Sequence, residues 1–128
     1  MEIEFLTVEE VRRIHQDQIS RYGGSPGVRD EGLLLSALAQ PGTRFGGEFL
    51  HPDLFLMAAA YLFHLARNHA FIDGNKRVAA VSCIVFLGLN GQRLRCTEDE
   101  LVDLVLRTAR GELEKSSVAG FLRTACSG

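Results

Sequence analysis

The sequence predicts an all-α protein, a single domain over residues 1–128 built as a bundle of about six helices with a possible small β-hairpin flap. Two capping boxes mark helix starts, and apolar residues follow them at helical spacing. The length of 128 residues is enough to bury one hydrophobic core, and no repeat, low-complexity tract or long linker divides the chain.

Helical signals begin near the N-terminus. Thr7 and Glu10 form the first capping box, and the periodic apolar residues after it end at the glycine pair 23–24, which predicts the first helix. A second, short helix is predicted over residues 30–40, because acidic residues stand at its start and Pro41 follows its last turn.

The middle of the chain predicts a flap followed by a buried helix. Gly46 and Gly47 suit a tight two-residue hairpin turn between short extended segments. Pro52 can start a third helix, and residues 54–66 are apolar on almost every side. A helix of this kind in a soluble protein is surrounded by other elements.

Three further helices are expected. Residues 78–91 are apolar and rich in β-branched side chains, so periodicity leaves a strand open, although the length favours a helix. Thr97 and Glu100 form the second capping box, which opens a helix to about Gly111. Residues 116–125 predict the last, short helix.

Composition excludes several classes of protein. Fourteen Lys and Arg against sixteen Asp and Glu give a net charge of −2, so no basic excess favours direct nucleic-acid or membrane binding. The three cysteines are too sparse for a disulfide framework, which suits a reducing compartment. The N-terminus lacks the features of a signal peptide, and the longest apolar run is shorter than a membrane helix. We expect a cytoplasmic protein.

The stretch NHAFIDGNKRVAA, residues 68–80, concentrates polar groups between the two most apolar helices. Asp73 and Gly74 allow a sharp turn at the start of the second of these helices, where the first N–H groups have no partner within the helix. Lys76 and Arg77 then place two cations where the helix dipole disfavours positive charge. This conflict is relieved by a bound anion, and it predicts a phosphate site.

Three other side chains of the stretch add the groups that phosphoryl transfer uses. His69 can accept a proton from an attacking hydroxyl, Asp73 can ligate Mg²⁺, and Asn75 can bind phosphate oxygens or cap the helix. Simpler structural roles stay open at this point. The histidine suits a helix C-terminus, Asp-Gly-Asn suits a turn, and Lys-Arg suits a solvated pair.

HAFIDGNKR resembles the signature of the Fic/Doc superfamily, His-x-Phe-x-(Asp/Glu)-Gly-Asn-(Gly/Lys)-Arg. The flanking IHQDQISRYGGSPGVRDEGLLLSALAQP and FLGLNG resemble those of death-on-curing (Doc) toxins, so the resemblance covers residues 3 to 122 approximately. It implies a Fic-like helical fold and a set of site residues. These are His69 as general base, Phe71 as a buried anchor, Asp73 as Mg²⁺ ligand, Gly74 and Asn75 in an anion hole, and Lys76 and Arg77 on the phosphates of ATP.

Two positions distinguish branches of this superfamily. Members of this superfamily that transfer AMP usually carry Gly at the position of Lys76 and a second Arg at the position of Ala80, so this chain resembles the Doc branch at both positions. The resemblance to the Doc branch implies a kinase that transfers the γ-phosphate of ATP to a threonine of elongation factor Tu and arrests translation. An AMP transferase and a catalytically dead nucleotide-binding module are the alternatives, and intact His69 and Asp73 argue against the dead module.

The resemblance also implies a regulatory partner. Many Fic enzymes carry an inhibitory Ser/Thr-x-x-x-Glu-Gly/Asn pattern, and Thr108 to Leu113 matches only its spacing because Leu113 stands in the last position. We therefore expect a cognate antitoxin supplied in trans, which lays an amphipathic segment into a groove near the site.

Other polar residues have weaker claims. His64 stands five positions before His69, off the face that would pair them on a metal. His15 is expected on a half-exposed helix face. Arg29 and Asp30 lie in the Doc-like flank, and an ion pair at the start of a helix explains them equally well.

Overall fold

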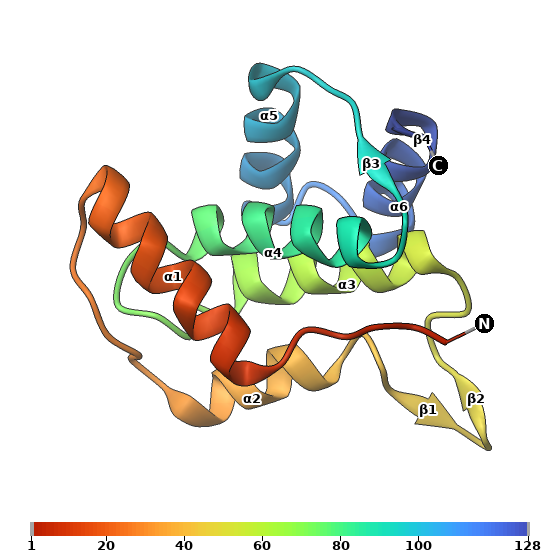
Figure 1. The fold of residues 1–128 in the computed structure, drawn as a ribbon, viewed down its shortest axis with the longest axis horizontal. Coiled ribbons are helices and arrows are strands. Elements are labelled where there is room, and N and C mark those ends of the chain that lie inside the picture. The colour runs from red at the N-terminus through yellow and green to blue at the C-terminus, as the bar shows by residue number, and fades with distance from the viewer. Residues whose placement is uncertain (1, 128) are drawn as a thin grey trace.

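The computed structural model describes residues 2–127, and within them it confirms the all-α class (Figure 1). The four strands are short and form two separate two-stranded sheets. The helices are α1 (Val8–Tyr22), α2 (Glu31–Ala39), α3 (Leu54–Arg67), α4 (Asn75–Leu89), α5 (Glu98–Ala109) and α6 (Lys115–Ala125), and the strands are β1 (Arg44–Phe45), β2 (Glu48–Phe49), β3 (Arg93–Leu94) and β4 (Cys126–Ser127).

Helices α3 and α4 lie side by side at the centre of the molecule, and the other helices pack around them (Figure 1). The alanines at 58–60 of α3 and Ala79 of α4 are fully buried, and such small side chains let two helices approach closely. α1 packs on α4, α2 packs on α3, and α5 and α6 also contact α3. The predicted burial of the third helix is confirmed.

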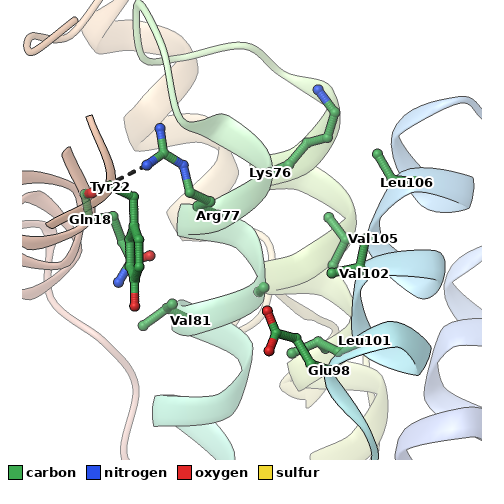
Figure 2. Close-up of a pocket in the computed structure, with 11 residues that line it drawn as sticks. Gln18, Tyr22, Lys76, Arg77, Val81, Glu98, Leu101, Val102, Val105 and Leu106 are labelled. Carbon is green, nitrogen blue, oxygen red and sulfur yellow. Dashed lines mark hydrogen bonds between the residues drawn. The ribbon is translucent and has the colours of Figure 1, made fainter. Parts of the chain in front are cut away.

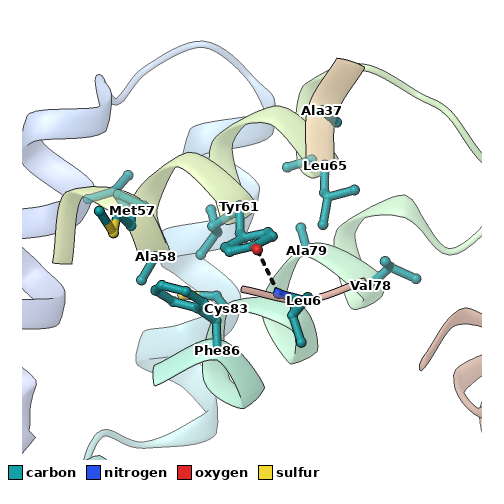
Figure 3. Packing of buried hydrophobic residues seen from close by; sticks show 14 of the residues in the cluster. Leu6, Ala37, Met57, Ala58, Tyr61, Leu65, Val78, Ala79, Cys83 and Phe86 are labelled. Atoms are coloured by element: carbon teal, nitrogen blue, oxygen red, sulfur yellow. Dashed lines mark hydrogen bonds between the residues drawn. The ribbon is translucent and has the colours of Figure 1, made fainter. Parts of the chain in front are cut away.

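A buried tyrosine connects the N-terminal segment to this central pair (Figure 3). The backbone N–H of Leu6 donates to the Tyr61 hydroxyl over 2.9 Å, and the Tyr61 ring packs against Phe86 with ring centroids 4.9 Å apart. Burial raises the pKa of Tyr61 to about 12, so the hydroxyl stays neutral. The segment before α1 is thereby fixed against the core.

The helix starts follow the sequence signals closely. Both capping boxes are present, at Thr7 for α1 and at Thr97 for α5. One detail of the third helix was wrong: Pro52 does not begin it, because Asp53 is the N-cap and its side chain accepts from the N–H of Leu56. An Asp side chain can satisfy a free N–H at a helix start, which Pro cannot do.

The hairpin flap is confirmed, with β1 and β2 antiparallel and joined by Gly46 and Gly47 at φ values of 60° and 84°. Positive φ at both central residues matches the right-handed twist of the two strands. The antiparallel β3–β4 pair was not predicted, since each of these strands has only two residues. Among residues 2–127, no helix combines the length and apolarity that crossing a membrane requires.

A partly buried polar cluster joins α3 and α6 to the segment before α3. The Lys115 Nζ lies 3.1 Å from Nε2 of His51 and 3.1 Å from Nε2 of His64. An ammonium group only donates, so both imidazoles accept at Nε2 and are neutral. Burial, followed by the charge of Lys115, lowers the pKa of His64 to about 4 and also lowers that of His51. Arg67 adds positive charge near His64.

This cluster predicts a loss of stability in mild acid. Because the pKa of His64 in the folded protein lies below its value of 6.5 in the unfolded chain, the unfolded chain binds the proton first as pH falls. The stabilisation is complete above about pH 6.5 and is lost progressively towards about pH 4. We expect the melting temperature to fall from pH 7 to pH 5, and to fall less in His64→Gln. An equal fall in His64→Gln and wild type would contradict this assignment. The control is His69→Asn, which replaces an exposed histidine by a residue that tolerates the positive φ there.

Candidate active site

The predicted site lies in the loop between α3 and α4, where the two central helices hold its ends. The α3 helix ends at its C-cap Asn68, and α4 begins after Gly74. The Asn75 side chain closes the loop, because its Oδ1 accepts from the N–H of Phe71 and its Nδ2 donates to the Phe71 carbonyl, both at 3.0 Å. Both ends of the Asn75 amide group are therefore engaged in shaping the loop.

His69 adopts a strained backbone conformation at the start of this loop. It is exposed and has a φ of 52°, and it is the only non-glycine residue of the part described, 2–127, with positive φ. A left-handed conformation of this kind costs on the order of 1 kcal/mol or more and must be held by its surroundings. The Arg29 Nε donates to the His69 carbonyl over 2.7 Å. The structure thus fixes the backbone that carries the predicted general base.

Asp73 presents an exposed carboxylate at the other end of the loop. The backbone N–H of Ser25 donates to Oδ2 over 3.2 Å, and the N–H of Gly74 donates to Oδ1 over 2.8 Å. These hydrogen bonds, first that of Ser25 and then that of Gly74, lower the pKa of the Asp73 carboxyl, and the charge of Arg77 acts in the same direction. The side chain is therefore an oriented anion at neutral pH.

The N-terminus of α4 has the features of an anion site. Its N-cap, Gly74, makes no side-chain capping bond, and the first turn contains no acidic residue. Lys76 is exposed on this turn and makes no hydrogen bond or ion pair within residues 2–127. Arg77, which we expect to bind phosphates, also contacts the protein: it donates to the Gln18 carbonyl over 3.2 Å (Figure 2) and to the Gly23 carbonyl over 2.9 Å.

The chain segment after α1 forms one wall of the site. The N–H groups of Arg29 and Asp30 both donate to the Ala70 carbonyl, over 2.8 and 3.0 Å. Val28 pairs with Phe71 in an isolated antiparallel bridge. Asp30 caps α2 by accepting from Leu33 N–H, and Arg29 bonds the His69 carbonyl, so the alternative of an Arg29–Asp30 ion pair was wrong.

The sequence interpretation missed His15 as part of this region. We expected a half-exposed position, but His15 is 4% exposed and stacks on Phe71, with ring centroids 4.0 Å apart and ring planes 12° apart. Its Nε2 lies 2.8 Å from the Asp73 carbonyl oxygen. The expected burial of Phe71 is confirmed, at 2% exposure. His15 was missed because its partners lie more than fifty positions away, and helical periodicity does not report such contacts.

Gly24 offered the clearest sequence signal for this packing. A Cβ atom there would lie 2.8 Å from the Asp73 Oδ2 and 3.1 Å from an Arg77 Nη, and the residue has a φ of 114°. Only glycine fits both conditions. The Gly-Gly pair was interpreted as a helix stop, which is correct for Gly23, whereas Gly24 is needed for the approach of the loop to the site.

The donor set fits Mg²⁺ bound together with a nucleotide. Among residues 2–127, no group of three or more His, Cys, Asp and Glu could hold a metal ion. Mg²⁺ commonly uses one or two carboxylates and takes its other ligands from phosphates and water. The single oriented carboxylate of Asp73 beside an uncapped helix N-terminus suits that mode of binding.

An apolar groove of 490 Å³ adjoins the site between α1, α4 and α5 (Figure 2). Val102 and Leu106 of α5 line it and are 48% and 38% exposed. Lys76 and Arg77 also line the groove, so the anion site and the groove share two side chains.

Comparison with known proteins agrees with the motif and the fold. The profile of the Fic/DOC family matches residues 5–87, which include the whole stretch from His69 to Arg77. The chain is 41% identical over 118 residues to "Protein kinase doc" of Escherichia phage P1, with 92% of each protein covered. It is also 41% identical over 103 residues to "Toxin Doc" of Mycolicibacterium smegmatis, with 79% of each covered. The chain therefore belongs to the Fic/DOC family.

Proposed function

We propose that this chain is a Doc-type toxin that transfers the γ-phosphate of ATP to a hydroxyl group of a protein target. The carrying observation is the uncapped N-terminus of α4, where exposed Lys76 lies in the first turn beside the loop that bears His69 and Asp73. Similarity over most of the chain to proteins named as a kinase and as a toxin supports the same assignment. A threonine of elongation factor Tu is the proposed acceptor, and arrest of translation is the proposed consequence.

The side chains divide the reaction between them. The target hydroxyl oxygen forms a bond to the γ-phosphorus, the bond from that phosphorus to the bridging oxygen breaks, and ADP leaves. His69 accepts the hydroxyl proton, while the first N–H groups of α4 and Lys76 bind the phosphate oxygens. Asp73 would hold Mg²⁺, which supplies positive charge to the phosphates when bound.

Arg77 has a second task in this proposal. It uses two N–H groups on the carbonyls of Gln18 and Gly23, which ties α1 to α4 beside the site. A guanidinium has five N–H donors, so three remain for a phosphate oxygen. Its contribution to nucleotide binding remains a prediction, as do those of Gly74 and Asn75.

The groove is the proposed binding site for the antitoxin. Its exposed apolar side chains, Val102 and Leu106, suit the apolar face of an amphipathic helix. Lys76 and Arg77 at the same groove favour acidic residues on that helix. Acidic residues of an antitoxin bound there would pair with Lys76 and Arg77, the two cations proposed to bind the phosphates. The antitoxin would then inhibit the toxin by competing with ATP.

The first prediction from this proposal concerns the base. We expect purified protein with Mg²⁺, a cytosolic extract and ATP to label protein from the γ-phosphate and not from the α-phosphate. His69→Ala should lower the rate by about 10²–10⁴-fold, since a positioned general base contributes that much. Because position 69 has positive φ, His69→Asn is the matched variant, as Asn tolerates this conformation and lacks the basic nitrogen.

His69→Asn should keep the melting temperature and the nucleotide affinity of the wild type, whereas His69→Ala should lose some stability because of the positive φ at this position. Label from the α-phosphate alone selects the AMP transferase, and absence of label from either position supports a nucleotide-binding module. An active His69→Asn would show that another group takes the proton.

Lys76 provides the second prediction, because it separates the two enzyme classes. Its ammonium is proposed to neutralise charge on the phosphates, so Lys76→Gly should lower γ-transfer more than about tenfold, ~1.4 kcal/mol of barrier. Glycine also weakens the first turn of α4, by about 1 kcal/mol relative to Ala. Lys76→Ala therefore serves as the control that removes the ammonium group without introducing a glycine into the helix. Undiminished transfer in both variants would show that Lys76 is a solvated side chain with no role in the transfer.

The third prediction concerns growth. Expression of the wild-type chain in bacteria should arrest growth and translation, whereas Asp73→Ala at equal expression should not, because the proposed metal ligand is absent. Asp103→Ala, which removes another exposed carboxylate, is the control and should stay toxic. Growth arrest by Asp73→Ala would show that toxicity does not require the proposed metal site.

Co-expression tests the groove in the same assay. An antitoxin that restores growth to cells with the wild-type chain should fail with Val102→Glu, because a carboxylate would stand in the apolar groove. Val102 is 48% exposed, so this variant should fold and stay toxic. Full rescue of Val102→Glu would place the antitoxin elsewhere.

A further inference from the structure

We infer that His15 is a positioning residue of the active site, because its ring holds the peptide group between Asp73 and Gly74 in a single orientation. In that orientation the Gly74 N–H points at the Asp73 carboxylate, and its hydrogen bond fixes the direction of the carboxylate. The inference rests on the proposed role of Asp73. His15 would act through this peptide and would not touch the substrate.

The contact is well defined for a side chain from a distant part of the chain. His15 lies on α1, is 4% exposed, and has Nε2 at 2.8 Å from the Asp73 carbonyl oxygen. A carbonyl oxygen only accepts hydrogen bonds, so Nε2 carries the proton and donates. The ring is also stacked on Phe71 at 4.0 Å, which fixes the direction of the donor.

The peptide needs such a contact because glycine follows it. Gly74 has a φ of 75°, and glycine adopts positive and negative φ with similar ease. The local backbone therefore permits this peptide to rotate. In a trans peptide the C=O and N–H point in opposite directions, so rotation would reverse both dipoles beside the proposed phosphate site. His15 opposes rotation by holding the oxygen.

The same peptide controls the carboxylate. The Gly74 N–H donates to Asp73 Oδ1 over 2.8 Å, while Ser25 N–H holds Oδ2 over 3.2 Å. A rotated peptide would withdraw the first of these donors. The Asp73 side chain would then keep one backbone hydrogen bond of two, and it would be less well oriented toward a metal ion.

α1 is a rigid support for this contact. Its start is fixed by a capping box at Thr7, and Arg77 of α4 binds the carbonyls of Gln18 and Gly23 at its other end. His15 therefore cannot readily follow a moving loop. A contact between rigid elements preserves geometry in a site better than one between two loops.

Two substitutions separate the donor from the ring. His15→Phe keeps an aromatic ring against Phe71 and removes the N–H donor. His15→Gln keeps an N–H donor at similar reach and removes the stacked ring. The readouts are the melting temperature, the half-saturating Mg²⁺ concentration for γ-transfer, the transfer rate at saturating Mg²⁺, and the Gly74 amide signal in protein labelled with ¹⁵N-glycine.

We expect His15→Phe to raise the half-saturating Mg²⁺ concentration and to lower the rate between about tenfold and a hundredfold, as small displacements in a site do. Its Gly74 amide should exchange with solvent faster than that of the wild type. His15→Gln should keep the Mg²⁺ dependence and the Gly74 signal close to those of the wild type, even where loss of the stacked ring lowers its melting temperature.

Three results would overturn the inference. Wild-type behaviour of His15→Phe in Mg²⁺ dependence and amide exchange would make His15 a packing residue. If the Mg²⁺ dependence and the Gly74 amide exchange changed in His15→Gln and stayed as in the wild type in His15→Phe, the effect would belong to the aromatic ring. Losses in both variants that simply follow their melting temperatures would indicate a structural role alone.

The amide measurements also distinguish this inference from the proposed function. If the wild-type chain transfers no phosphate, the proposed function fails, and Mg²⁺ titration followed at the Gly74 amide still tests His15. Faster exchange and weaker Mg²⁺ response in His15→Phe, with neither change in His15→Gln, would then uphold the positioning role without catalysis.

Discussion

The close packing of α3 against α4 is the contact on which the rest of the structure depends (Figure 1). Both helices bury small and large apolar side chains along their length, and the loop with His69 and Asp73 connects them directly. The positions of the loop ends therefore follow from the hydrophobic core. A site held in this way needs little additional order to bind a ligand, because its ends are already fixed.

The loop itself is ordered by polar contacts from outside the central pair. Arg29 binds the His69 carbonyl, and the backbone at 27–30 pairs with residues 70–72. These contacts hold His69 in a left-handed conformation that the residue would otherwise rarely adopt. Strain of this kind persists only where surrounding structure imposes it, and here it occurs at the proposed general base.

Charge and apolar surface meet at the same end of α4. Lys76 and Arg77 stand in the first helical turn, where the dipole disfavours cations, and both also line the apolar groove beside α5. Arg77 finds compensation in the carbonyls of α1, whereas Lys76 has no such partner within residues 2–127. The two neighbours thus differ: Arg77 uses part of its guanidinium to join two helices, whereas the whole Lys76 ammonium is available to an anion.

The sequence by itself determined the helices, the flap and the location of the motif, because capping boxes, apolar periodicity and the Gly46-Gly47 turn are local signals. It also indicated an anion site, since two cations follow Gly74 at a helix start, where the dipole disfavours positive charge. Only the tertiary structure decided that Arg77 joins α4 to α1, that Asn75 closes the loop on Phe71, and that His15 and Arg29 support it. These contacts join residues whose proximity is set by helix packing, and a side chain with several possible partners takes the one that the folded chain brings within reach.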